Sequence, residues 1–120
     1  MIEVNEYVRT KDGKIDKVIN SNFYMSIYVE CEKGLYLIEN IVKHSKQLID
    51  LIEVGDYVNG HLIVKIRIDP FTKKKQLFTE HWEYNWQGDG TLVVFYDEDI
   101  KTILTKEQFE TNCYKVGGEE

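Results

Sequence analysis

Residues 54–58 read Val-Gly-Asp-Tyr-Val and repeat the pattern of residues 4–8, which read Val-Asn-Glu-Tyr-Val. A turn signal follows each copy, Asp12-Gly13 after the first and Asn59-Gly60 after the second. Such dipeptides tolerate positive φ and mark tight hairpin turns. We therefore expect a short strand leading into a hairpin to occur twice. Five matching positions indicate a repeated local geometry more strongly than a duplicated fold.

Two stretches of the chain alternate apolar with other residues, and a period of two is typical of half-buried strands. Within residues 23–30 the expected buried face consists of Phe23, Met25, Ile27 and Val29. Within residues 62–68 it consists of Leu62, Val64, Ile66 and Ile68. Further short strands separated by turn residues make the chain mainly β, in one domain that spans residues 1–120.

Two short helices are expected. Ser45 precedes apolar residues spaced three and four apart, which predicts a short helix or a 3₁₀ segment. Thr105 and Gln108 have the spacing of a capping box, which predicts a second short helix that ends near Asn112, with Phe109 facing the core.

Composition narrows the class of protein. The chain has 120 residues, 42% of them hydrophobic and 30% charged, as in ordinary globular proteins. The net charge of -6 opposes a broad surface for nucleic acid, whose phosphates dominate affinity. Cys31 and Cys113 do not make a disulfide framework, and we expect both thiols to be reduced. Neither a signal peptide nor an apolar run of about 20 residues is evident, so we expect a cytoplasmic protein.

Residues 7–18 (YVRTKDGKIDKV) and 55–58 (GDYV) resemble the strand-turn-strand start of SH3-like small barrels. This resemblance implies a small antiparallel SH3-like barrel, and bent antiparallel sheets are the other architecture that we expect. The chain is also similar to small proteins encoded by phages and prophages of AT-rich Firmicutes. Residues 41–46 (IVKHSK), 49–60 (IDLIEVGDYVNG) and 100–109 (IKTILTKEQF) carry that similarity. It implies a mobile-element origin and supplies no catalytic residue.

The chain contains residue types that bind metals or catalyse reactions, but they lack the spacing of known metal-binding or catalytic motifs. The three histidines and two cysteines lack the close pairs of zinc sites, and Asp97-Glu98-Asp99 reads as a solvated turn rather than a calcium loop. Glu6 and Asp56 begin strands, which explains them without catalysis. No phosphate-binding loop or nucleophile elbow occurs. We therefore expect no enzyme activity, no metal and no cofactor.

Residues 65–75 contain five basic side chains: Lys65, Arg67, Lys73, Lys74 and Lys75. From residue 76 to residue 99 there are acids and no Lys or Arg. Lys65 and Arg67 share one face of a strand, where cations either protect a sheet edge from aggregation or bind single-stranded nucleic acid beside aromatics. Edge protection is our preferred interpretation, because the surrounding acids weaken attraction to phosphate.

Trp82, Tyr84 and Trp86 occupy one face by period two. Three large aromatics on one face usually belong to a core, and this is our first expectation. If the face is exposed instead, it is the best partner-binding surface in the chain, since Trp and Tyr dominate hot spots.

These observations predict a non-enzymatic binding protein of the phage or prophage type. We expect it to bind, and in doing so to inhibit, a host protein such as a defence nuclease. The expected partner-binding residues are Lys73, Lys74, Lys75, Trp82, Tyr84 and Trp86. The alternative is a nucleic-acid- or nucleotide-binding barrel that uses Lys65 and Arg67.

Overall fold

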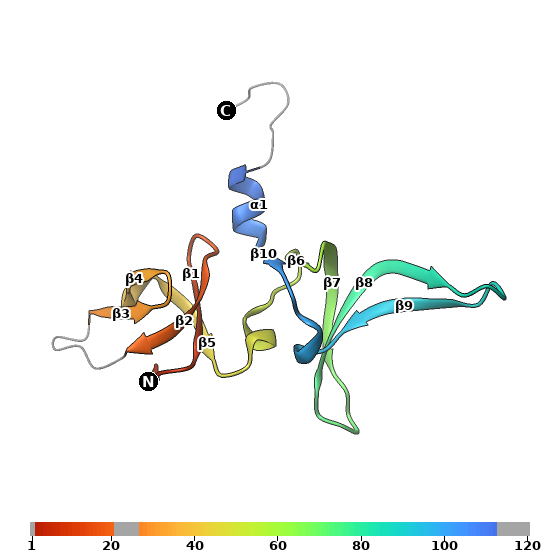
Figure 1. The fold of residues 1–120 in the computed structure, drawn as a ribbon, viewed down its shortest axis with the longest axis horizontal. Helices are drawn as coiled ribbons and strands as arrows, with labels where there is room; N and C mark the ends of the chain where they lie inside the picture. The colour runs from red at the N-terminus through yellow and green to blue at the C-terminus, as the bar shows by residue number, and fades with distance from the viewer. Residues whose placement is uncertain (1, 21–26, 113–120) are drawn as a thin grey trace.

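The N-terminal half of the chain forms a five-stranded antiparallel sheet (Figure 1). The structure is a computed structural model, and it describes residues 2–20 and 27–112. The strands are β1 (Tyr7–Thr10), β2 (Ile15–Asn20), β3 (Tyr28–Cys31), β4 (Gly34–Leu37) and β5 (Ile41–Ser45). In the order β4-β3-β2-β1-β5, the first four strands meander and the fifth returns to lie beside β1. A 3₁₀ turn at Ile38–Asn40 precedes that return.

The C-terminal half has the same connectivity. Its strands are β6 (Tyr57–Val58), β7 (His61–Ile68), β8 (Lys75–Tyr84), β9 (Gly90–Phe95) and β10 (Ile103–Leu104). The order β10-β6-β7-β8-β9 again places the last strand beside the first, after a 3₁₀ turn at Asp97–Asp99. The 3₁₀ turn Leu48–Leu51 lies between the halves, and α1 (Lys106–Asn112) follows β10. One strand pattern is therefore used twice.

The repeated five-residue pattern begins both sheets. Its second residue has a positive φ in each copy, 74° at Asn5 and 103° at Gly55. The N–H of the acid that follows donates to the carbonyl of a glutamate three positions earlier: Glu6 to Glu3 at 3.1 Å, and Asp56 to Glu53 at 3.0 Å. The expected repetition of local geometry is confirmed. The matching glutamates extend the repeat by one position that the sequence analysis missed.

The same turn also holds the second strand of each sheet. Each turn exchanges two backbone hydrogen bonds with a fully buried residue of that strand, Val18 in one half and Ile63 in the other. The N···O distances are 2.9 Å (Asn5 to Val18), 2.8 Å (Val18 to Glu6), 2.9 Å (Gly55 to Ile63) and 2.9 Å (Ile63 to Asp56). The two halves therefore share the register of their first hairpin as well as the geometry of the turn.

Each half has its own apolar cluster. The cluster of the N-terminal half consists of Val8, Val18, Val29 and Cys31. The cluster of the C-terminal half consists of Ile49, Ile52, Val58, Ile63 and Leu77. Val8 and Val58 occupy the same position of the repeat, and both are fully buried. The final Val of the pattern therefore anchors each core.

The predicted buried face of residues 62–68 is partly wrong, although Ile66 packs against the core of its half. Ile63 is the buried residue of β7, while Leu62 is 39% exposed and Ile68 is 57% exposed; Val64 and Ile66 are partly buried. The register shifts between Ile63 and Lys65, where β7 pairs with β8. A bulge inserts a residue and interrupts the alternation of faces, so a strict period of two fails across it.

The predicted buried face of residues 23–30 is partly wrong. Phe23 and Met25 lie outside the described residues. Val29 is 2% exposed, as expected, but Ile27 is 53% exposed. Ile27 precedes β3, which begins at Tyr28, so the alternation of the strand does not extend to it.

The helices follow the sequence in part. The segment after Ser45 is a 3₁₀ turn preceded by Gln47, and Ser45 itself ends β5, so Ser45 is not the cap. The capping box before α1 is confirmed: the Gln108 N–H donates to Thr105 Oγ1 at 3.3 Å, and the Thr105 N–H donates to Gln108 Oε1 at 3.2 Å. Phe109 does not face a core, because it is 41% exposed and stacks on Tyr57.

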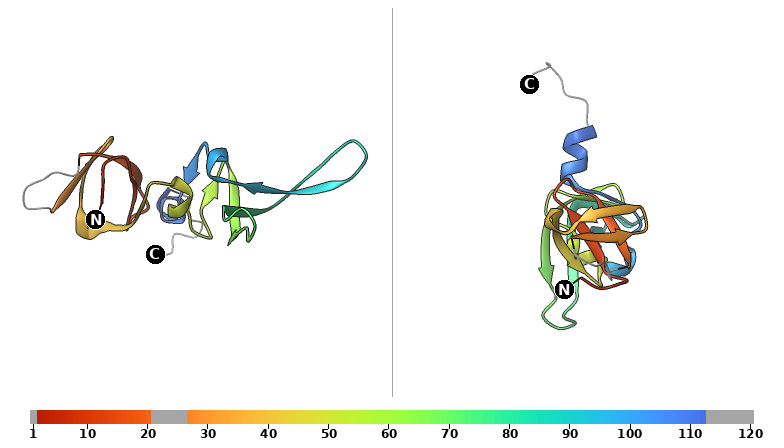
Figure 2. Two further views of the ribbon diagram at one scale, coloured as in Figure 1. Left: turned by 90° about the horizontal axis from the view of Figure 1, so that it is seen from below. Right: turned by 90° about the vertical axis from the view of Figure 1, so that its left-hand side faces the viewer.

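The molecule is extended rather than barrel-like. Over the described residues both sheets are open, and the β8–β9 hairpin projects away from the rest of the chain (Figures 1 and 2). The radius of gyration is 17.0 Å, compared with about 13–14 Å for a compact domain of this length. The expectation of bent antiparallel sheets describes this fold better than a closed SH3-like barrel. That residues 1–120 form one domain stays a prediction.

Candidate functional site

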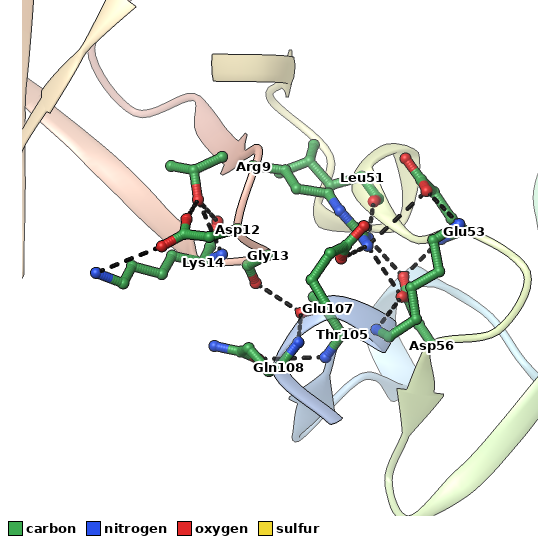
Figure 3. Close-up of polar contacts among 12 residues, drawn as sticks. Arg9, Asp12, Gly13, Lys14, Leu51, Glu53, Asp56, Thr105, Glu107 and Gln108 are labelled. Carbon is green, nitrogen blue, oxygen red and sulfur yellow. Dashed lines mark hydrogen bonds and ion pairs between the residues drawn. The ribbon is translucent and has the colours of Figure 1, made fainter. Parts of the chain in front are cut away.

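A buried arginine joins the two halves. Arg9 extends from β1 and is 1% exposed, and its guanidinium meets Asp56 at the start of the second sheet (Figure 3). Arg9 Nη1 lies 2.5 Å from Asp56 Oδ2, and Nη2 lies 3.0 Å from Oδ1, which is the two-pronged pairing that arginine makes with carboxylates. Nη1 also donates to the Leu51 carbonyl at 2.9 Å, and Nη2 to Glu107 at 2.7 Å. We call this set of contacts the joint.

The charges of the joint are balanced. Burial by itself would lower the pKa of Arg9, but the hydrogen bond and charge of Asp56 and the bond to Glu107 hold it above its ordinary value. Burial likewise opposes ionisation of Glu53, yet hydrogen bonds from Lys106 and Lys43 and the charge of Arg9 lower its pKa to about 2. Three carboxylates (Asp56, Glu53 and Glu107) therefore face three cations (Arg9, Lys43 and Lys106).

A second polar contact reinforces the joint. The Thr105 hydroxyl donates to the Gly13 carbonyl at 2.8 Å, which links α1 to the first hairpin. Gly13 has a φ of +88°, and a Cβ placed there would lie 2.3 Å from Thr105 Oγ1. Glycine is therefore required by both the turn and the close approach.

The Asp56 carboxylate of the joint is saturated with hydrogen bonds from the protein itself. Besides Arg9, the Asp56 carboxylate accepts the N–H of Glu53 at 2.7 Å and the N–H of Lys106 at 2.9 Å. Both of its oxygens are thereby occupied, and no acceptor remains for a substrate. Glu6, the counterpart of Asp56, pairs with His44 at 2.5 Å. The interpretation of these acids as residues that begin strands agrees with the geometry.

Within residues 2–20 and 27–112, no group of three His, Cys, Asp or Glu residues could hold a metal ion. The rings of His61 and His81 lie 4.8 Å apart. Cys31 is buried, and burial, followed by nearby acids, raises the pKa of its thiol to about 11, which makes it a poor nucleophile. Cys113 lies outside the described residues.

One continuous surface runs along the outer side of the β8–β9 hairpin. Directly paired residues of antiparallel strands point to the same side, as do residues two apart in one strand. Phe78 pairs with Lys65 on β7 and with Val94 on β9, and beyond a bulge Trp82 pairs with Leu92 and Tyr84 with Gly90. We call this surface the outer face: Lys65, Arg67, Phe78, Trp82, Tyr84, Leu92 and Val94.

The expectation that the three aromatics form a core is wrong. Trp82, Tyr84 and Trp86 are 51%, 68% and 91% exposed. They lie on the arm (residues 80–92), the outer part of the hairpin, where β8 and β9 extend beyond their pairing with β7 (Figure 2). A two-stranded ribbon has no second layer, so both of its faces are open to water. The alternative expectation, an exposed aromatic surface, therefore holds.

The two groups of predicted cations occupy different places. Lys65 Nζ lies 6.0 Å and the Arg67 guanidinium carbon 5.6 Å from the centre of the Phe78 ring, so both flank an aromatic on the outer face. Lys73 and Lys74 lie in the β7–β8 turn, and Lys75 pairs with Asp50 at 3.2 Å. Lys75 and Tyr84 are roughly 25–30 Å apart along the strand. The three lysines and the three aromatics therefore lie at opposite ends of β8, and their role in binding a partner stays a prediction.

The arm itself is acidic. Glu80, Glu83 and Asp89 are exposed on it, and no Lys or Arg occurs from residue 76 to residue 100. The aromatics of the arm therefore stand in a negative field, while cations lie at the base of the outer face.

Comparison of the chain with models of protein families, with curated proteins and with solved structures found no match. None of the helices in the described part of the chain has the length and apolar character needed to cross a membrane.

Proposed function

We propose that the protein is a non-enzymatic binding module and that it holds a partner protein with the aromatic arm. The observation that carries this proposal is the exposure of Trp82, Tyr84 and Trp86 on a projecting hairpin. Uncovered aromatics are unfavourable in water and are the residues that most often dominate protein interfaces. A hairpin that stands clear of the body can enter a recess on another protein.

The charge of the arm supports a protein partner over a nucleic acid at this position. Glu80, Glu83 and Asp89 would repel phosphates near the aromatics. They would complement a partner with an apolar recess and a basic rim, because complementary charge speeds association and fixes orientation. A phage or prophage origin, which we expect from the sequence, leads us to propose a host protein such as a defence nuclease as the partner, with inhibition as the consequence of binding.

Nucleic-acid binding is the second candidate. Lys65 and Arg67 flank the half-buried ring of Phe78 on the outer face, and cations beside aromatic rings are a common means of holding single strands. The two candidates predict different residues, since the arm aromatics serve the first and the cations at the base of the outer face serve the second.

A pull-down from a lysate of a Firmicutes bacterium, with and without nuclease treatment, tests the proposal. We expect a captured protein that persists after nuclease treatment and is lost when Trp82 and Trp86 are both replaced by Ala. Phe71→Ala is the matched control, because Phe71 is 92% exposed in the β7–β8 turn, away from the arm. Equal capture by the Trp82→Ala/Trp86→Ala variant would contradict the proposal.

A titration with labelled single-stranded DNA separates the second candidate. If the outer face binds nucleic acid, affinity falls with rising salt and is lost in a Lys65→Glu/Arg67→Glu variant. Nuclease-sensitive capture together with this loss would replace protein binding by nucleic-acid binding as the function.

A further inference from the structure

β9 is an edge strand, and no other strand of the described residues pairs with its open side. It stands last in the order β10-β6-β7-β8-β9, with β8 on one side. The Val93 carbonyl accepts a hydrogen bond from the Thr79 hydroxyl of β8 at 2.9 Å, so the backbone C=O of Val93 points toward β8. Backbone groups of neighbouring residues in a strand point to opposite sides, and Leu92 and Val94 therefore direct their N–H and C=O groups away from the sheet.

Apart from the bulge of β8 between the partners of Val94 and Leu92, this edge lacks the protection that natural sheet edges usually have. Charged side chains, Pro, bulges or short length normally prevent an edge from pairing with another strand. β9 reads Gly-Thr-Leu-Val-Val-Phe, six residues without charge or proline. A strand of this kind can accept a further strand through main-chain hydrogen bonds.

The other terminal strands of the two described sheets are protected. β10 has two residues, and β5 carries Lys43 and His44. β4 has four residues and borders a cleft whose lining includes Lys11, Asp12 and Lys14. Among these edges β9 combines the greatest length with an absence of charge.

The charges at the two ends of β9 indicate what can pair with it. Asp89 precedes the strand, and Asp97, Glu98 and Asp99 follow it. Among the described residues these four acids form no ion pair with a Lys, Arg or His side chain. Two copies of β9 paired about Val93 would place Asp89 of each beside Asp97 of the other, and opposed like charges destabilise strand pairing. A second copy is therefore disfavoured.

We propose that β9 accepts an extended segment of the partner protein as an additional strand, one with an uncharged β-forming centre and Lys or Arg at both ends. The segment pairs with the outward N–H and C=O groups of Leu92 and Val94, and its basic ends lie beside Asp89 and the acids of 97–99. This inference rests on the proposed protein-binding function but uses the edge of the hairpin rather than its aromatic side chains.

The probe is a ten-residue synthetic peptide with a centre of alternating Thr and Val and two Lys at each end. Peptide at about 1 mM, which detects even weak association, should slow amide hydrogen exchange at Leu92 and Val94. Exchange at Val93, whose N–H already faces β8, should stay unchanged. A matched peptide with Glu ends should bind about tenfold more weakly or worse, since it opposes the charges of the edge.

Val94→Pro removes one outward N–H without removing a hydrogen bond to β8, and Pro is tolerated at such edge positions. Binding of the peptide should be abolished while the thermal melt stays cooperative. Should this variant not fold, N-methylation of the peptide amides that face β9 provides the same test on the natural chain. Peptide binding that survives N-methylation, or no added protection of Leu92 and Val94, overturns the inference.

Two further outcomes of the peptide experiment would each overturn the proposed strand addition. Protection of Leu92 and Val94 without peptide, together with a dimer in sedimentation equilibrium, would show that a second copy occupies the edge and would overturn the inference. Failure of the peptide together with capture that depends on Trp82 and Trp86 would overturn the strand addition and leave the proposed function standing. The two proposals therefore fail separately.

Discussion

At the scale of single residues, Arg9 determines how the halves meet. Removing a guanidinium from water costs several kcal/mol, and the cost is offset only where the charge is paired and its donors are used. Arg9 meets this condition through Asp56, Glu107 and the Leu51 carbonyl. The same contacts make Asp56, which is fully buried, dependent on Arg9.

Replacing Arg9 by Leu should lower the free energy of unfolding by about 3–5 kcal/mol, because it leaves the buried Asp56 charge without its partner. The Arg9→Leu/Asp56→Asn double variant should recover part of that loss, since it also removes the unpaired charge of the Asp56 carboxylate. Urea denaturation of both variants measures the two effects.

The exposed pair between Lys14 and Asp12 is the control for this experiment, because its side chains are 59% and 67% exposed. Lys14→Ala should change stability by no more than about 0.5 kcal/mol. A loss of similar size for Arg9→Leu would show that the joint contributes little.

At the scale of elements, β8 changes its role along its length. Its first half packs into the core through Leu77 and Thr79, both almost fully buried. Beyond the bulge between Phe78 and Trp82 it becomes one strand of the two-stranded arm. Tyr84 lies over Gly90, where an added Cβ would come within 2.6 Å of its ring. The ring shields the backbone of β9 at a position without a side chain.

Two alanine substitutions along this hairpin should separate core from arm. Leu77→Ala should cost about 2–5 kcal/mol, because it removes fully buried methyl groups and leaves a cavity. Trp86→Ala should stay within about 0.5 kcal/mol, since the indole is already in water. Chemical denaturation provides both values, and a cost above about 1 kcal/mol for Trp86→Ala would mean that the tip is covered in solution.

At the scale of the whole molecule, one connectivity is used twice, and the two halves differ in the length of their strands. The N-terminal copy keeps short strands around its own cluster, with Val18 and Val29 at its centre. The C-terminal copy extends β8 and β9 into the arm. The joint lies between the two clusters, so it should couple the folding of one half to that of the other.

Labelling of the Cys31 thiol can report this coupling, with Cys113 replaced by Ser. Cys31 is 3% exposed, so it should react only after the N-terminal half opens. In the parent protein the urea midpoint for labelling should coincide with the midpoint for loss of far-UV circular dichroism. In Arg9→Leu the two midpoints should separate, and separation in the parent would contradict coupling through the joint.

Local features were determined by the sequence itself. Asn59 and Gly60 have positive φ values of 54° and 84°, as their dipeptide predicts, and the capping box of Thr105 and Gln108 is present. The repeated pattern indicated the shared turn geometry. Each of these depends on contacts between residues close in the chain, which a short stretch of sequence specifies.

Burial was decided by the tertiary structure. A period of two divides a strand into two faces but does not say which face another layer covers, so Trp82 and Tyr84 read as core and are exposed. The bulge beside Ile63 moved the buried face of β7 by one residue. Arg9 is buried because Asp56, 47 residues away, completes its hydrogen bonds. Coverage and pairing depend on partners distant in the sequence, and only the assembled sheets bring those partners together.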